Sequence, residues 1–484
     1  MLFSSIFFLF FFLPATLILY FSVGPKLRNL VLLSASLLFY AWGEVGYVLL
    51  MLFSISINWI FGLLINGSKS TPKRCKLFLI FGIILNLLPL AFFKYGNFLL
   101  DNLSYLGSGV IADKLGEGQI HLPIGISFFT FQAISYIVDV YRNTADVQKQ
   151  PINLALYISL FPQLIAGPIV RYHDVARQIV QRTVSLVDFQ YGAQRFVLGL
   201  GKKVLIANNI GAVADHIYSL PVETLPAGLL WLGMLTYTLQ IYYDFSAYSD
   251  MAIGLGRMFG FHFLENFNYP YSSRSIQEFW RRWHISLSSW FKDYLYIPLG
   301  GNRKRTGRTY FNLLMVFFLC GLWHGASWTF VIWGLFHGMF LVLERGAFGK
   351  VIGRLPGIVQ HTYTILVVMI GWVFFRAESL EQALAYLKSL ANFSTSPYLD
   401  AKLFATMNTE FYIALFVGII FSYPIVPRLF SQYSYRLEQA KVSTRLLIGS
   451  ITTAGTIVWI SFVIIYSSAQ LMSGSHNPFL YFRF

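Results

Sequence analysis

The chain has 484 residues, of which 56% are hydrophobic and only 12% carry a charge. A soluble globular protein carries about 25% charged residues, so this composition excludes a soluble enzyme and predicts a protein that crosses a membrane many times. The net charge of +15 does not require a nucleic-acid partner, because basic cytoplasmic loops of a membrane protein account for it. The two cysteines, Cys75 and Cys320, are too few for a disulfide framework or a zinc cluster, so no metal site is expected.

The apolar segments predict a series of membrane helices. The first, at 2–23, has no basic residue before it, so we interpret it as a retained helix and not as a cleaved signal peptide. Basic residues follow the first, third and fifth segments, and the positive-inside rule then places the N-terminus on the outer face. The loop at 101–121 has one lysine and three acidic residues, as expected for the outer side. The later segments lie near 30–45, 47–65, 77–97, 124–140, 196–219, 226–244, 310–323, 328–343, 362–376, 411–426 and 446–466.

One further apolar segment, at 154–170, is interrupted by Pro162 and Pro168. Arg171 follows this segment, on the same predicted side of the membrane as Arg142 before it. A segment that enters and leaves on one face is re-entrant, and other parts of the protein must then bury its backbone. The alternative is a kinked but complete span.

The largest basic block lies at 257–309, which the predicted topology places in the cytoplasm. Within it, Ser275 and Glu278 have the spacing of a capping box that begins a helix. From Phe279 to Lys292, aromatic and basic residues fall on opposite sides at helical spacing. This pattern predicts one amphipathic helix at the membrane interface. His284 lies at the boundary of its two faces, where it either faces a cavity or reaches into water.

Histidines within apolar segments are candidate functional residues, because an ionisable side chain at membrane depth is costly. His324 is the strongest candidate, and the alternative is a buried histidine that bonds a backbone carbonyl. We expect His337 to form an interhelical hydrogen bond. We expect Cys320, one helical turn before His324, to be a small core residue and not an acyl relay. No role is assigned to the remaining histidines, which lie near segment ends or in loops.

A polar stretch at 242–250 follows the apolar segment 226–244 and contains Asp244 and Asp250. Its carboxylates and hydroxyls either join helices through hydrogen bonds or line a polar cavity. Two acids at this spacing do not establish an acid–base pair.

Several long motifs are similar to those of the membrane-bound O-acyltransferase (MBOAT) family. The resemblance is strongest to its bacterial branch that O-acetylates alginate and related exported polysaccharides, and it covers 122–377 closely and both ends loosely. Ala247 departs from a glycine that is common in relatives, a change expected to affect packing more than chemistry. The motifs are Glu278–Ser286, Tyr294–Arg303 and Gly321–Gly325, with support from Leu122–Phe129, Phe161–Pro168 and Gly371–Ala377.

The resemblance implies an all-α polytopic fold with about 11–13 membrane-spanning helices, plus re-entrant and interfacial helices, around a central funnel. It implies one domain at 1–484, with N-terminal helices at 1–121, a catalytic core at 122–377 and C-terminal helices at 378–484. It implies that His324 is the catalytic histidine in the narrow part of the funnel and that His284 is the second characteristic histidine.

The implied reaction is acyl transfer from a cytoplasmic thioester, with acetyl-CoA as the expected donor and no permanently bound cofactor. A neutral imidazole can take the proton of an attacking hydroxyl, and the apolar surroundings of His324 disfavour its charged form. The basic block either binds the phosphates of coenzyme A or only sets the topology. Its candidate phosphate ligands are Arg281, Arg282, Lys292 and Arg303.

The expected function is O-acetylation of an exported cell-surface polysaccharide such as alginate, by a multi-pass protein of the bacterial inner membrane. The expected partners are the lipid bilayer, the polysaccharide acceptor and acetyltransferase proteins on the outer face. One alternative is D-alanyl transfer from a carrier protein to teichoic acid. Another is a transporter or flippase, which would be expected to show repeated halves that this sequence lacks.

Overall fold

The computed structural model describes residues 1–105, 120–165, 167–303, 305–392, 400–438, 442–474 and 476–478. These residues form helices and no strand, which confirms the predicted all-α class. Lys304 of the basic block and most of the predicted outer loop at 101–121 lie outside the described residues.

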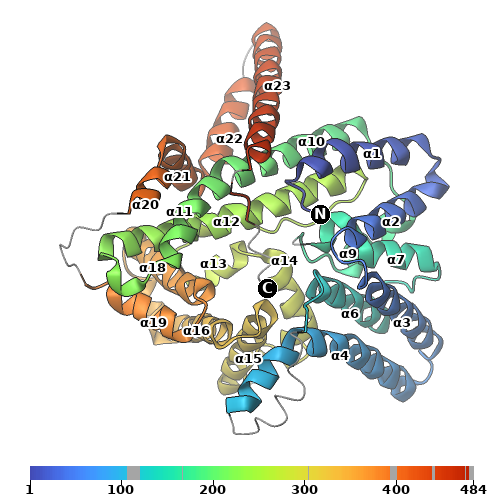
Figure 1. The fold of residues 1–484 in the computed structure, drawn as a ribbon. Coiled ribbons are helices and arrows are strands. Elements are labelled where there is room, and N and C mark those ends of the chain that lie inside the picture. Colours follow the sequence, from blue (N-terminus) through green and yellow to red (C-terminus); the bar gives the residue numbers. More distant parts are fainter. Residues whose placement is uncertain are drawn as a thin grey trace.

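The other helices surround a short helical pair near the centre of the molecule, α13 (Ile276–Arg282) and α14 (Ile285–Phe291) (Figure 1). The helices before this pair are α1 (Leu13–Ser22), α2 (Pro25–Ala41), α3 (Val48–Gly67), α4 (Pro72–Tyr105), α6 (Ile126–Arg142), α7 (Pro151–Ser159), α8 (Phe161–Leu164), α9 (Tyr172–Val180), α10 (Leu186–Gly201), the π-helical turn η2 (Lys202–Ala207), α11 (Asn208–Ser219) and α12 (Ala227–Met258). The helices after it are α15 (Thr306–His324), α16 (Trp328–Arg345), α17 (Ala347–Ile352), α18 (Gly357–Arg376), α19 (Leu380–Ser389), α20 (Ala401–Thr406), α21 (Thr409–Phe421), α22 (Ile425–Glu438) and α23 (Val442–Met472).

Five helical stretches of the described residues are long and apolar enough to cross a membrane. The apolar segments expected from the sequence all coincide with helices, and the protein is a multi-pass membrane protein. The remaining helices are shorter or more polar, because other parts of the protein cover much of their surface; most of α12, for example, is buried. The five stretches are Val48–Gly67, Pro72–Leu103, Leu186–Ser219, Gly357–Arg376 and Ile448–Met472.

The predicted re-entrant segment forms two short helices whose flanking arginines contact one residue. Helices α7 and α8 are separated at Leu160, which leaves the helical conformation with a ψ of 112°. Before the segment, Arg142 donates a hydrogen bond of 2.9 Å to the Asp293 carbonyl. After the segment, Arg171 pairs with the Asp293 carboxylate. Both ends therefore lie at the same face of the molecule, and surrounding protein buries most of the backbone between them.

A polar cluster at this face fixes the ends of α6 and α9. The Asp139 carboxylate accepts hydrogen bonds from His173 Nδ1 at 2.9 Å and from the Tyr294 hydroxyl at 2.7 Å. The hydrogen bond to Asp139 raises the pKa of His173 above its ordinary value. His173, on a segment outside the predicted spans, thus joins two helices through a bond that depends on its protonation.

The polar stretch at 242–250 lies inside α12, which continues to Met258 instead of ending near Asp244. Lys203 Nζ lies 2.7 Å from Asp244, and Lys202 and Arg195 each lie 2.6 Å from Asp250. Basic residues of α10 and η2 thus neutralise both carboxylates, so the helix remains stable through its polar part. The sequence left open whether the polar groups of this stretch join helices or line a cavity. The ion pairs of Asp244 and Asp250 with neighbouring helical segments fit the first interpretation.

The predicted single amphipathic helix at 279–292 is wrong in two respects. The chain breaks between α13 and α14, where His284 adopts a left-handed conformation with a φ of 44°. The aromatic face packs inside the protein and not on lipid, since Phe279, Trp283 and Trp290 are all buried. Periodicity could not detect the break, because aromatic and basic residues keep helical spacing across it. The predicted cap is confirmed: the Ser275 hydroxyl accepts from the Glu278 amide at 3.0 Å.

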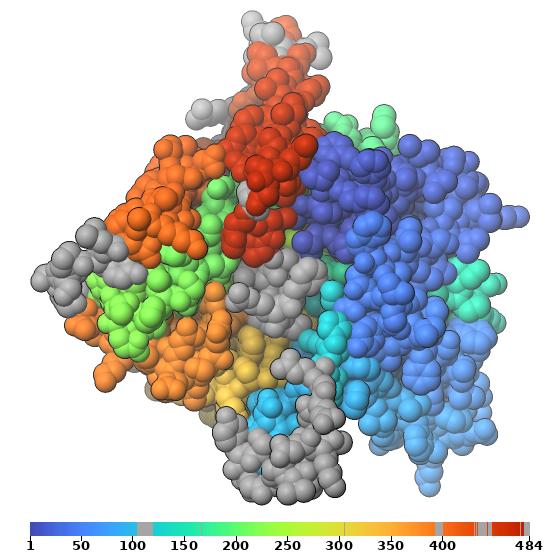
Figure 2. Space-filling model, in the orientation of Figure 1, coloured from blue at the N-terminus to red at the C-terminus, as the bar shows by residue number. Residues whose placement is uncertain are grey.

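Glycines allow α15 and α16 to approach closely. A Cβ atom on Gly321 would lie 2.3 Å from the Phe330 carbonyl oxygen, and one on Gly334 would lie 2.2 Å from the Phe317 carbonyl oxygen. Small residues at such contacts are typical of membrane helix pairs. The close approach brings the end of α15, with His324, against the middle of α16. By contrast, α23 stands out from the body with little of its surface covered (Figure 2).

Candidate active site

His324 is the last residue of α15 and is 4% exposed. Its ring lies 4.9 Å from the ring of Trp333 on α16 and 5.2 Å from that of Phe375 on α18, measured between centroids. The predicted position between two apolar helices is confirmed, and helix packing adds a wall of aromatic rings. Because these rings exclude water, a polar substrate group beside His324 would meet few competing hydrogen-bond partners.

His284 lies beside His324, with 6.5 Å between the ring centroids. It occupies the break between α13 and α14 and is 1% exposed, so the alternative of a side chain that reaches into water is excluded. The break turns the backbone so that a residue from the boundary of an amphipathic pattern faces the interior. Residues 40 positions apart in the sequence thus form one histidine pair.

Asn266 holds His284 in one orientation. Its side-chain carbonyl accepts hydrogen bonds from His284 Nδ1 at 3.1 Å, from the Ser286 amide at 3.1 Å and from the Ser286 hydroxyl at 2.8 Å. Its amide group donates to the Ser249 hydroxyl at 3.0 Å. Since an amide oxygen only accepts, His284 Nδ1 carries the proton and Nε2 has a free lone pair. Among the described residues, Nε2 has no hydrogen-bond partner, so it is available to a substrate.

Two residues of α4 hold the end of α15 that carries His324. Lys94 is 7% exposed and donates hydrogen bonds to the Trp323 carbonyl and, at 3.2 Å, to the Ser127 hydroxyl. Tyr95 donates to the Leu322 carbonyl at 2.9 Å. The last carbonyls of a helix have no partner within the helix and carry partial negative charge, which a cation and a hydroxyl satisfy. Lys94 and Tyr95 thereby fix the position of His324.

The four basic residues predicted to bind coenzyme A differ in their environment. Arg281, Lys292 and Arg303 are exposed. Arg282 pairs with Glu278 at 2.8 Å and donates to the Asn268 carbonyl at 3.1 Å. Three of the four are therefore accessible to a phosphate, and phosphate binding stays a prediction.

His337 lacks the interhelical hydrogen bond that the sequence predicted. It is completely buried, and neither ring nitrogen has a hydrogen-bond partner among the described residues. Its ring packs at centroid distances of 5.1 Å from Trp280 and 5.4 Å from Trp333, and it faces Gly371. The aromatic cage leaves no room for a polar partner. Cys320 is buried in the apolar core, as expected.

The other histidines lie apart from the pair and have partners of their own. These contacts are His121 with Glu44, His173 with Asp139, His216 with Asp400, His262 with Asp188, His361 with Tyr423 and His476 with Asp215.

Lys94 and Asn266 were missed by the sequence interpretation. Lys94 is a lone cation inside the apolar segment 77–97, so the rule that singled out His324 would also have found it. Asn266 carries no such signal, because its neighbours Glu265 and Phe267 belong to an ordinary polar loop. Only its hydrogen bonds show that it positions His284.

Comparison with known proteins finds a matching family model and several similar chains. The model of the MBOAT, membrane-bound O-acyltransferase family matches residues 142–377, a range that includes both histidines. The probable alginate O-acetylase AlgI of Azotobacter vinelandii is 41% identical over the whole of both chains.

The chain belongs to the MBOAT family.

Two further relatives are similar to this MBOAT chain. The probable alginate O-acetylase AlgI of Pseudomonas aeruginosa is 47% identical over 82% of this chain and 76% of its own length. The peptidoglycan O-acetyltransferase of Helicobacter pylori is 39% identical over 81% of this chain and 80% of its own length. The protein is therefore a membrane O-acyltransferase.

Proposed function

We propose that this MBOAT protein transfers an acetyl group from acetyl-CoA in the cytoplasm to a hydroxyl of an exported polysaccharide on the far side of the bacterial inner membrane. The observation that carries the proposal is the pair of His324 and His284, buried together near the centre of the fold. The names of similar proteins, alginate O-acetylases and a peptidoglycan O-acetyltransferase, support an acetyl group and a polysaccharide.

In the proposed reaction, the acceptor hydroxyl attacks the carbonyl carbon of the acetyl thioester. His324 takes the hydroxyl proton as the new C–O bond forms. The C–S bond then breaks, and the leaving thiolate receives the proton from His324. The unprotonated Nε2 of His284 accepts a hydrogen bond from the thiol once the thiol is protonated, or from a neighbouring hydroxyl of the acceptor, and so orients the substrate. One C–O bond forms, one C–S bond breaks and the proton passes from the hydroxyl to the thiolate, so the transfer needs no further reactant.

The access routes follow from the predicted topology. Arg281, Lys292 and Arg303 lie on the predicted cytoplasmic side, where exposed cations attract the phosphates of coenzyme A. The acceptor approaches from the outer side, the face on which the N-terminus is predicted. A polysaccharide chain is too large for an enclosed site, so partner proteins on the outer face either present it or first accept the acetyl group themselves.

The proposal is tested by the variant His324→Ala in cells that make the polymer. We expect polymer-bound acetate to be lost while the protein reaches normal membrane levels, and His262→Ala, an exposed histidine that pairs with Asp188, to retain it. Retained acetylation in His324→Ala contradicts the proposed base. The donor is tested with purified protein and labelled acetyl-CoA, or an acyl carrier protein charged with D-alanine. Label transfer from the carrier alone would favour the D-alanyl alternative.

A further inference from the structure

A groove of 980 Å³ lies between the body of the protein and its C-terminal helices. The lining residues of its inner wall belong to α10, η2 and α12, and those of its outer wall belong to α21, α22 and α23. Much of the lining is apolar, including Leu205, Ile253 and Val463. The outer wall consists of helices whose apolar side chains are exposed; Ile413, for example, is 59% exposed. In a membrane, these side chains contact lipid, so the groove opens sideways into the bilayer.

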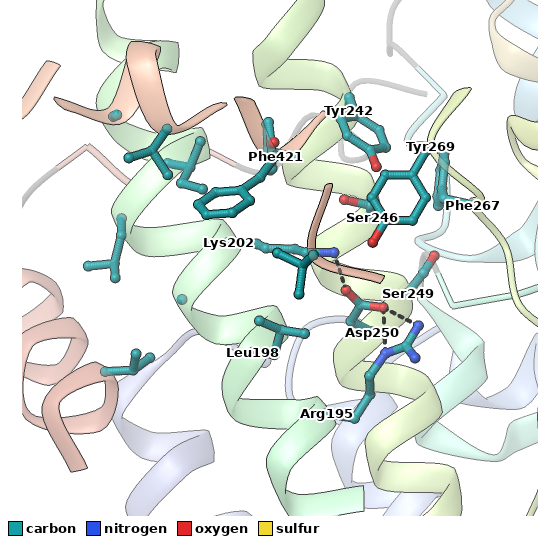
Figure 3. Close-up of a pocket in the computed structure, with 18 of the residues that line it drawn as sticks. Arg195, Leu198, Lys202, Tyr242, Ser246, Ser249, Asp250, Phe267, Tyr269 and Phe421 are labelled. Atoms are coloured by element: carbon teal, nitrogen blue, oxygen red, sulfur yellow. Dashed lines mark hydrogen bonds and ion pairs between the residues drawn. The ribbon is translucent and has the colours of Figure 1, made fainter. Parts of the chain in front are cut away.

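One end of the groove is polar. Asp250 pairs with both Lys202 and Arg195, and Arg195 also pairs with Glu265 at 2.6 Å (Figure 3). Asp250 is 6% exposed, whereas Glu265 is 52% exposed. The two positive and two negative charges cancel. The cluster therefore gives no net attraction to an anion, but it offers separate positive and negative groups to a ligand that carries both.

A hydroxyl group one helical turn from this cluster has no partner. Ser246 lines the groove and is 2% exposed, and its hydroxyl has no hydrogen bond among the described residues. A buried hydroxyl without a hydrogen bond costs about 1–3 kcal/mol. In the open groove, a ligand with an acceptor oxygen at this depth would remove that cost.

The order of chemical groups along α12 matches one phospholipid. Asp250, with its charged partners, is followed after one turn by Ser246 and after another by Tyr242, and the facing walls combine apolar residues such as Leu205 and Val463 with the polar residues Asn209, Glu410 and Tyr466. The lining residues from Ile253 to Tyr242 span about 17 Å of helix, close to half of a hydrocarbon core of about 30 Å. The groove thus has about the length of one leaflet, with the charged cluster of Asp250 near one end and mostly apolar walls elsewhere. An acetyl group alone would fill only a small part of the groove, so the groove fits a longer ligand.

We infer that this groove binds one zwitterionic phospholipid of the phosphatidylethanolamine type, from the leaflet on the side of Glu265. The ammonium group pairs with Glu265, and the phosphate lies beside Lys202 and Arg195. Ser246 donates to an ester carbonyl of the lipid, and one acyl chain fills the space between α12 and α21. The neutral cluster selects a headgroup that carries both charges over an anionic one. Asn266 and Ile285 also line the groove, so the lipid site borders the histidine pair, but lipid labelling is measured without acetyl transfer and therefore tests the site separately from the proposed function.

Photocrosslinking in membranes that contain the full chain tests this site. A phosphatidylethanolamine with a diazirine in its acyl chain is expected to label peptides of α10, α12 and α21. Ile413→Trp and Leu198→Trp place a larger side chain in the groove from opposite walls and are expected to lower this labelling about tenfold. The matched control is Ile465→Trp, an exposed position on α23 that does not line the groove, and it is expected to leave labelling unchanged.

The headgroup is tested by a second, conservative variant. Glu265→Gln removes one negative charge from an exposed position, so the cluster becomes positive and is expected to prefer a phosphatidylglycerol probe. Equal labelling in Ile413→Trp, Leu198→Trp and Ile465→Trp would overturn the groove as a lipid site. Equal labelling by the two probes, both in the unaltered protein and in Glu265→Gln, would overturn the assigned headgroup.

Discussion

Replacement of Asn266 by alanine tests whether the orientation of His284 matters for the reaction. The substitution removes the acceptor for His284 Nδ1 and for two groups of Ser286, together with the donor to Ser249. Without that acceptor, His284 can carry its proton on either nitrogen. In a fraction of the molecules, Nε2 then carries the proton and presents no lone pair to the substrate.

The expected loss of stability follows from these bonds. A buried polar group left without a partner costs about 1–3 kcal/mol. Ser286 keeps one partner, because its hydroxyl still accepts from the Ile169 amide at 2.9 Å. His284 Nδ1 and the Ser286 amide are the two groups left without this acceptor, so we expect Asn266→Ala to lower the free energy of unfolding by about 2–6 kcal/mol. A displacement of the ring by about 1 Å would lower the transfer rate by about 10²-fold.

The assay is acetyl transfer per molecule of folded protein in membranes, with the thermal midpoint measured on the same samples. Asn266→Asp keeps an acceptor oxygen for His284 and Ser286, so we expect it to restore most of the activity lost in Asn266→Ala. Asn268→Ala, an exposed asparagine in the same loop, is the matched control for stability and expression. Activity in Asn266→Ala equal to that of the unaltered protein would refute the positioning role.

Three further predictions concern groups around the site. Lys94→Met and Tyr95→Phe each remove a hydrogen bond to the end of α15, and Tyr95→Phe should lower the free energy of unfolding by about 1 kcal/mol. Both variants should lower kcat more than they raise KM for the thioester. A purely structural role would lower only the amount of folded protein. Gly371→Ala places a Cβ atom 2.6 Å from His337 Nε2, so overpacking should lower the free energy of unfolding by about 1–3 kcal/mol. His337→Ala in the same chain should recover part of that loss. If the losses of the two single variants simply add in the double variant, the contact is contradicted. The pKa of His173 is raised by its bond to Asp139, so the stability from this bond is fully present below the ordinary histidine pKa of about 6.5. That stability is lost as pH rises through the higher folded-state pKa. The thermal midpoint should therefore fall over this pH range, and the fall should be smaller in His173→Gln.

The sequence by itself determined the class of protein, the positions of the helices and the place of His324 between two apolar helices. Each of these depends on local composition. Long runs of apolar residues form helices in a membrane, because a helix satisfies the backbone polar groups within a single segment. An ionisable residue inside such a run is costly wherever the run is placed. The capping box at Ser275 and the re-entrant segment near Pro162 could be predicted for the same reason.

Tertiary structure alone decided how the site is built. Lys94 and the Trp323 carbonyl are 229 residues apart in the sequence, and Asn266 reaches His284 only because the chain breaks between α13 and α14. Periodicity describes one helix at a time, so it predicted a continuous amphipathic helix where packing required a left-handed turn. The lysines that neutralise Asp244 and Asp250 likewise belong to other helical segments. Partners so distant in sequence leave no local pattern, since only the packing of whole helices brings their charges and hydrogen-bonding groups together.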